Sequence, residues 1–151
     1  MRENISSLKK FDAVFLNGTS ENFEKIENQI KGINPNIKIF RTFYEISNIE
    51  KFNLESKYLI FSGIGNPSDF KDMLLENKFK IVKEMIFTDH YKYNFRDFEK
   101  IQDNAKNENL KIITTEKDYM KIPEIFRKQI DFIAIDLVIQ NEKEFINLLN
   151  K

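Results

Sequence analysis

The chain has 151 residues, enough for one domain with a substantial core, and 41% of them are apolar. Its 24 Lys and Arg balance its 24 Asp and Glu, so the chain lacks the excess of positive charge that is typical of nucleic-acid-binding proteins. There is no cysteine and only one histidine, which excludes a disulfide framework and thiolate or multi-histidine metal sites. Neither a signal peptide nor an apolar run of membrane-spanning length is visible, so we expect a cytoplasmic protein.

Short apolar runs that suit β-strands alternate along the chain with stretches of helical periodicity. The pattern predicts strands at 11–16, 37–43, 58–61, 81–87, 112–114 and 132–138. It predicts helices from Ser20 to Gly32, from Asn66 through Leu74, from about Asn94 to Ala105, and over 142–149. Such alternation indicates a mostly parallel sheet covered on both faces. We therefore predict a single α/β domain over residues 1–151, three-layered and Rossmann-like.

Three polar clusters follow predicted strands, at Ser62 to Asn66, at Thr88 to Tyr91 and at Thr114 to Asp118. In open α/β sheets, functional sites collect at the carboxyl ends of strands. We therefore expect the three clusters to lie along one edge of the sheet. The sequence contains no G-x-x-x-x-G-K-[ST], so no backbone cradle for a triphosphate can be identified in it.

The turn containing Gly63 and Gly65 resembles a dinucleotide fingerprint, because a predicted strand precedes it and a predicted helix follows. However, Ser68 stands at the third glycine position, and Pro67 removes a backbone donor next to the helix start. The preferred interpretation is a tight turn with close strand–helix packing, in which Asn66 occupies the N-cap position.

The single histidine, His90, comes directly after a predicted strand and is flanked by Asp89, Tyr91 and Tyr93. An imidazole can accept or relay a proton near neutral pH when a carboxylate holds it. The alternative is an ordinary surface histidine at a strand end.

The tetrad from Thr115 to Asp118 also has two interpretations. It fits a helix cap with a surface ion pair, which we prefer, or a polar loop that lines a cleft.

Four motifs, taken together and in order, resemble the tetraacyldisaccharide 4′-kinase family. Residues 61–70 match F-x-G-I-G-N-P-x-x-F, residues 87–93 match F-x-D-H-x-x-Y, and residues 114–118 match T-T-E-K-D. Near the start, residues 2–14 are similar to the family's R-E-x-x-x-x-L-x-x-A-D stretch. One departure is Tyr91, which stands where many members have a second histidine. The resemblance spans essentially the whole chain and implies the C-terminal subdomain of a P-loop kinase.

This family transfers the γ-phosphate of ATP, with Mg²⁺, to the 4′-hydroxyl of a lipid A disaccharide precursor at the inner membrane. The resemblance implies that His90, with Asp89 beside it, partners a catalytic Asp of the P-loop subdomain. It implies that Arg2 and Glu3 face the nucleotide, and that Glu3 also faces the metal. Further residues are expected to line the cleft: Gly63, Gly65, Asn66, Thr115, Glu116, Lys117 and Asp118.

Because the P-loop subdomain is absent from these 151 residues, the leading hypothesis is a C-terminal kinase half that is inactive and binds ATP weakly by itself. A separate P-loop half would complete it at the inner membrane face. The main alternative is a non-enzymatic module that binds a nucleotide or a partner, whose exposed surface would favour self-association. A weaker alternative is an independent enzyme that uses an Asp89–His90 dyad, although no cofactor or nucleophile motif accompanies it.

Overall fold

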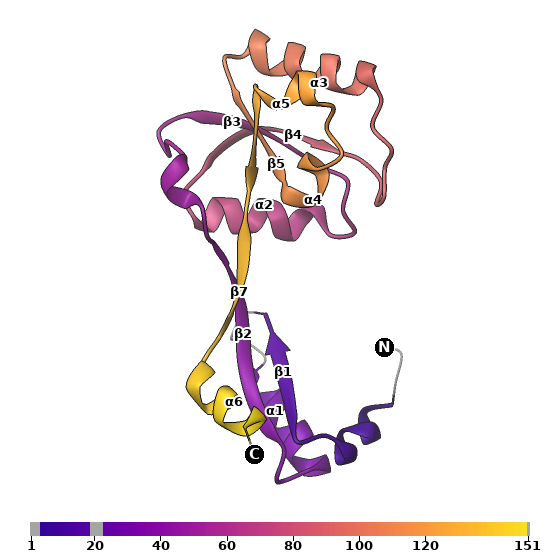
Figure 1. The fold of residues 1–151 in the computed structure, drawn as a ribbon, viewed down its shortest axis with the longest axis vertical. Helices are drawn as coiled ribbons and strands as arrows, with labels where there is room; N and C mark the ends of the chain where they lie inside the picture. The colour runs from indigo at the N-terminus through magenta and orange to yellow at the C-terminus, as the bar shows by residue number, and fades with distance from the viewer. Residues whose placement is uncertain (1–3, 19–22, 151) are drawn as a thin grey trace. The chain divides into compact units, whose positions relative to one another are not determined.

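The structure is a computed structural model that describes residues 4–18 and 23–150 (Figure 1). It has the predicted α/β architecture with parallel strand pairs. The chain divides into two compact units, one formed by residues 1–45 with 136–151 and the other by Ile46–Ile135. The described strands accordingly form two sheets, one of three strands and one of four. Periodicity finds strands but does not say which sheet they join, since pairing depends on distant partners.

The first unit is built on the smaller sheet. Its elements are η1 (Ile5–Lys10), β1 (Ala13–Asn17), α1 (Phe23–Ile33), β2 (Lys38–Ile46), β7 (Ile135–Ile139) and α6 (Glu142–Leu149). On one face of this sheet, the ring of Phe40 packs 5.3 Å from that of Phe145 in α6. From the next position of β2, Arg41 pairs with Glu27 of α1 at 2.7 Å. Alternate β2 residues therefore contact the two helices, as the pleat of a strand requires.

The second unit is a three-layer domain, with helix α2 on one face of its sheet and helices α3 and α5 on the other (Figure 1). Its elements are η3 (Ile49–Lys51), β3 (Lys57–Ser62), α2 (Pro67–Glu76), β4 (Lys80–Ile86), α3 (Phe95–Asn107), β5 (Lys111–Thr115), α4 (Glu116–Tyr119), α5 (Glu124–Arg127) and β6 (Ile130–Ile133). All three strand pairs of this sheet are parallel. The layered arrangement is the one that strands alternating with helices favour.

The core of the second unit follows the alternation of side chains along β3. Leu59 and Phe61 pack with the apolar face of α3, whereas Tyr58 and Ile60 pack with α2. All four side chains are at most 1% exposed. Burial on both faces explains why β3 reads as a continuous apolar run in the sequence.

The predicted strand at 132–138 is wrong in one respect, because it is two strands that join different sheets. Strand β6 ends at Ile133, and Ala134 then leaves the β-ladder. The Ala134 N–H donates to Oδ1 of Asn48 at 3.0 Å, and its carbonyl accepts from the Ser47 N–H at 2.9 Å. The apolar pattern runs on through this break, so the sequence carries no signal for it.

The predicted helices are present, with small differences at their ends. Gly32 lies in the last turn of α1, which ends at Ile33, while Ser20 lies outside the described residues. Helix α3 begins directly after Asn94, close to its predicted start, and Asn94 caps it by accepting from the Asp97 N–H. Across residues 4–18 and 23–150, no helix is both long enough and apolar enough to span a membrane.

Candidate functional site

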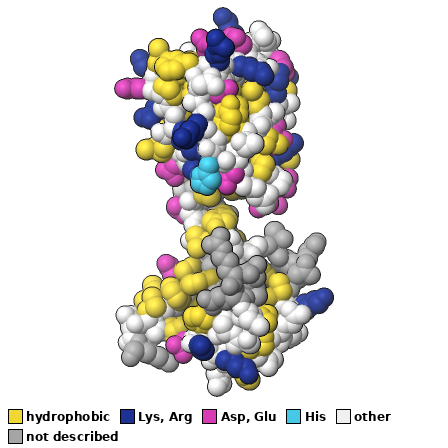
Figure 2. Space-filling view, turned by 90° about the vertical axis from the view of Figure 1, so that its right-hand side faces the viewer, with side chains coloured by type: hydrophobic (Ala, Val, Ile, Leu, Met, Phe, Trp, Pro, Cys, Tyr) yellow, Lys and Arg dark blue, Asp and Glu magenta, His cyan; other side chains and the backbone are white. Residues whose placement is uncertain are grey.

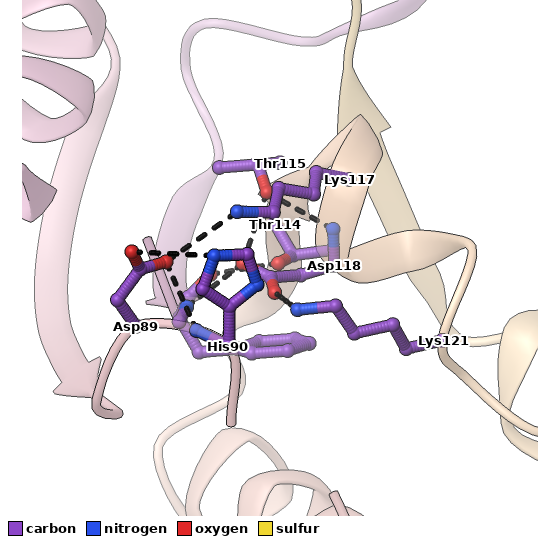
Figure 3. Close-up of polar contacts among 9 residues, drawn as sticks. Asp89, His90, Thr114, Thr115, Lys117, Asp118 and Lys121 are labelled. Carbon is purple, nitrogen blue, oxygen red and sulfur yellow. Dashed lines mark hydrogen bonds and ion pairs between the residues drawn. The ribbon is translucent and has the colours of Figure 1, made fainter. Parts of the chain in front are cut away.

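The three polar clusters meet at one edge of the larger sheet, which confirms the expected arrangement. Strand β3 lies between β4 and β5, so the carboxyl ends of the three strands are neighbours. Gly63 directly follows β3, and Asp118 lies shortly after β5. The Gly63 N–H donates to Oδ2 of Asp118 over 2.8 Å. Lys117 Nζ lies 3.4 Å from Oδ1 of Asp89, which follows β4 (Figure 3). The sheet therefore gathers residues from three motifs into one site.

Asp118 is the buried centre of this site, with none of its side chain exposed. One carboxylate oxygen accepts from Gly63 and from the Thr115 hydroxyl, which is 3.0 Å away. The other lies 2.7 Å from Nζ of Lys121. Thr115 Oγ1 also accepts from the Asp118 N–H at 3.1 Å, which confirms the predicted capping arrangement. Sequence reasoning missed Lys121, although an acidic and a basic residue three positions apart on a helix can pair.

A glycine is required at position 63 because neighbouring atoms leave little room for a side chain, and not because the backbone has a positive φ. A Cβ built there would lie 3.0 Å from the Tyr93 hydroxyl oxygen and 3.3 Å from the Thr88 carbonyl oxygen. The preferred interpretation of a tight turn is therefore correct about close packing, but the close neighbour is the 88–93 segment rather than helix α2. At Gly65 the nearest atom to such a Cβ would be Oδ2 of Asp89, at an ordinary 3.6 Å.

Tyr93 fills the space beneath this turn. Its hydroxyl oxygen is buried and makes no hydrogen bond within the described part of the chain. Burial first, and then the negative charge of Asp118, raise the pKa of the Tyr93 phenol above its usual value. Lys121 Nζ lies 5.6 Å from the centroid of the same ring, within cation–π range.

His90 and Asp89 form the exposed part of the site. The His90 side chain is 80% exposed, and its Nε2 lies 3.7 Å from Oδ2 of Asp89. Figure 2 shows this single histidine on the surface, in cyan. A hydrogen bond of 3.0 Å from the Tyr91 N–H to the Thr88 carbonyl closes the turn, and His90 takes a φ of 58°. The left-handed region is uncommon for residues other than glycine, so the turn holds His90 in a restricted conformation.

Asp89 is held as a carboxylate by its neighbours. Partial desolvation acts to raise its pKa, but hydrogen bonds from Lys117 and the His90 N–H outweigh this effect. The pKa of Asp89 is therefore lower than usual, and the group is negatively charged at neutral pH.

The remaining predicted residues lie at the rim of the site or outside the described residues. Asn66 occupies the N-cap position of α2, but its side chain donates to Asp69 and accepts no hydrogen bond from the helix backbone. Glu116 is exposed at the first position of α4. Arg2 and Glu3 lie outside the described residues.

The described residues do not form a complete metal site. Among residues 4–18 and 23–150, no three His, Cys, Asp or Glu side chains are grouped to hold a metal ion. Both carboxylate oxygens of Asp118 are already engaged by donors from the protein, and the exposed carboxylate of Asp89 is paired with Lys117. Mg²⁺ at nucleotide sites is usually held by one or two carboxylates together with waters and substrate phosphates, so these residues alone do not complete its coordination.

Comparison with known proteins now identifies the family. The sequence model of the family described as LpxK, tetraacyldisaccharide-1-P 4′-kinase, matches residues 1–151. The chain belongs to this family. Its tetraacyldisaccharide 4′-kinase relative from Pelagibacter ubique (strain HTCC1062) is 46% identical over 151 residues, which are 100% of this chain and 48% of the relative. The relative of the same name from Elusimicrobium minutum (strain Pei191) is 31% identical over 162 residues, covering 96% of this chain and 43% of that protein.

The chain spans about half the length of the curated relatives it matches. A solved structure, the "apo" form of LpxK from Aquifex aeolicus in complex with ATP, aligns with 99% of this chain and 45% of its own. The TM-score is 0.62 and the sequence identity 20%, so this likeness supports the α/β fold. The resemblance seen in the four motifs is confirmed.

Proposed function

We propose that this chain provides the C-terminal subdomain of a tetraacyldisaccharide 4′-kinase, which phosphorylates the 4′-hydroxyl of a lipid A disaccharide precursor at the expense of ATP. The convergence of the family's motifs on one sheet edge is the observation that supports this most directly. A P-loop half, in the same polypeptide or another, supplies the phosphate cradle, since the 151 residues contain no G-x-x-x-x-G-K-[ST]. The reaction takes place at the inner membrane face, where its lipid substrate resides.

In this proposal His90 presents its imidazole to the catalytic carboxylate of the P-loop half. Its high exposure leaves the ring free to meet a second surface, and Asp89 lies close enough to orient it. Lys117 in turn restrains Asp89 from the neighbouring strand end. His90 thereby tunes the carboxylate that receives the hydroxyl proton, and it does not accept the proton alone. Such positioning matters because phosphoryl transfer relies on alignment and charge neutralisation.

ATP supplies the phosphoryl group and Mg²⁺ neutralises its charge when both are bound. Since the described residues do not make a metal site, the metal ligands belong to Glu3 and to the P-loop half in this proposal, and Arg2 faces the nucleotide. The isolated chain is accordingly expected to be inactive.

The test is a chimera in which this chain replaces the matching segment of the Pelagibacter ubique relative. ATP-dependent phosphorylation of the disaccharide is measured with and without His90→Ala. We expect the substitution to lower kcat by about 10²- to 10⁴-fold, the range for a group engaged in proton transfer. Lys92→Ala is the matched control, because Lys92 is an exposed neighbour two positions away.

Two outcomes would contradict the proposal. A chimera that phosphorylates the disaccharide equally well with His90→Ala would remove the histidine from the mechanism. Phosphorylation by the 151-residue chain alone would show that it is not half of a kinase.

A further inference from the structure

We propose that Asp118 is a positioning residue that holds the His90 turn in place through Gly63. The inference rests on the proposed role of His90 in phosphoryl transfer, and it gives the buried part of the site a role of its own. Three steps carry it: the burial of Asp118, its bond to Gly63, and the packing of Gly63 against the segment that bears His90.

The first step is that Asp118 is buried and fully engaged. None of its side chain is exposed, and its oxygens accept from Gly63, Thr115 and Lys121 over 2.7 to 3.0 Å. A buried carboxylate is costly unless several donors satisfy it together. The group is therefore fixed in one geometry, which suits a structural anchor rather than a ligand-binding side chain.

The second step is that a helix cap alone does not explain this carboxylate. The N-cap of α4 is already provided by Thr115, whose Oγ1 accepts from the Asp118 N–H. The Asp118 carboxylate instead accepts from Gly63, 55 positions earlier in the chain and directly after the neighbouring strand β3. This bond joins the end of β3 to the end of β5 at the level of the site.

The third step is that Gly63 has no freedom against the His90 turn. A single added carbon would come within 3.0 Å of the Tyr93 hydroxyl, 3.3 Å of the Thr88 carbonyl and 3.4 Å of Tyr91 Cβ. These residues flank His90 on both sides. Since packed interiors transmit small displacements, a shift of Gly63 moves the base of the turn.

His90 depends on this support because its own side chain has few contacts. The ring is 80% exposed, and its charged neighbours, Asp89 and Lys117, are themselves 44% and 48% exposed. Such surface contacts hold a side chain weakly. The turn beneath, anchored through Gly63, therefore determines where the imidazole stands.

The activity test uses the chimera and the variant Asp118→Asn, which keeps the size of the side chain and removes its charge. We expect kcat to fall by about 10- to 100-fold, as for a catalytic group displaced by about 1 Å, with KM for both substrates changed by less than about threefold. In a His90→Ala background, Asp118→Asn should lower kcat by no more than about twofold, because the group that it positions is gone. Asp103→Asn, an exposed position on α3, is the matched control.

A second readout needs no activity and uses the 151-residue chain. His90 is the only histidine and Gly63 one of four glycines, so their NMR signals are readily assigned. We expect Asp118→Asn to shift the imidazole signals and to make hydrogen exchange of the Gly63 amide about tenfold faster. Gly63→Ala disturbs the other end of the same link, and it should shift the imidazole signals even if Asp118→Asn fails to fold.

The inference is overturned if Asp118→Asn leaves the His90 signals and Gly63 exchange unchanged. It is also overturned if the substitution lowers kcat as strongly in the His90→Ala background as in the wild type, since that result indicates general destabilisation. Full activity of His90→Ala would instead remove the histidine from the proposed mechanism and, with it, the catalytic consequence of the link through Gly63. The NMR readout separates the two failures, because it reports on the link whether or not His90 is used.

Discussion

Asp89 and Asp118 lie at the same sheet edge, each in a family motif, yet their surroundings are opposite. Asp89 is 44% exposed and faces His90 and Lys117 at the surface. Asp118 is completely buried, and donors from the protein occupy both of its oxygens. Membership of a motif therefore does not reveal a residue's task. The exposed carboxylate can meet a ligand or a second surface, whereas the buried one can act only through the fold.

The largest difference between the two carboxylates should appear in stability. Asp118→Ala leaves the buried Gly63 N–H without its acceptor and Lys121 without its partner, so the free energy of unfolding should fall by about 3 kcal/mol. Asp89→Ala should have little effect, because its ion pairs are at the surface. Urea denaturation followed by circular dichroism measures both. Equal losses for the two variants would mean that the burial contrast has no energetic consequence.

A second contrast lies in the two glycines of the G-I-G turn. Gly63→Ala forces a carbon against the Tyr93 hydroxyl and the Thr88 carbonyl, and should reduce the free energy of unfolding by about 1 to 3 kcal/mol. Gly65→Ala is the matched control, since its nearest neighbour, at 3.6 Å, is an ordinary contact. The same denaturation experiment compares them. If Gly65→Ala were the more damaging variant, the close approach at Gly63 would not be what constrains this turn.

Tyr93 offers a test of the buried side at alkaline pH. Because burial and the charge of Asp118 raise the pKa of the phenol, its neutral form is favoured in the folded state. This stabilisation is complete below the unfolded pKa of about 10 and is lost as pH rises above it. Tyr93→Phe should therefore flatten the fall in melting temperature above about pH 10.

Near pH 7, Tyr93→Phe should leave the free energy of unfolding unchanged or raise it by up to about 1 kcal/mol, since the buried hydroxyl has no partner in the described residues. A marked loss of stability near pH 7 would instead reveal a hydrogen bond made by that hydroxyl.

The smallest effect is expected on the exposed side, at acid pH. The pKa of Asp89 is lowered in the folded state, so its contribution is present above the unfolded pKa and is lost as pH falls below about 4. Asp89→Asn should remove this slight acid dependence of the melting temperature. Added salt should diminish the difference between wild type and variant, because exposed charges are screened. A difference in melting temperature that persists in high salt would show that the charge of Asp89 is shielded from solvent, as that of Asp118 is.

Local hydrogen bonding and hydrophobic patterning determined much of this molecule from the sequence alone. The helix starts at Asn94 and Thr115 are set by side chains that bond to backbone three residues away, so tertiary context was not needed to predict them. The gathering of three motifs at one edge followed from the parallel order of strands. Four ordered motifs likewise sufficed to indicate the family.

Only the tertiary structure decided which strands share a sheet, that the predicted strand at 132–138 is interrupted at Ala134, and which of the two carboxylates is buried. These properties depend on contacts between residues far apart in the chain, such as Gly63 with Asp118, and adjacent sequence carries no record of them. In the sequence, Asp89 and Asp118 are indistinguishable, because each is an aspartate in a polar cluster that follows a predicted strand. The sheet distinguishes them, because it encloses one beneath a turn and leaves the other at the rim.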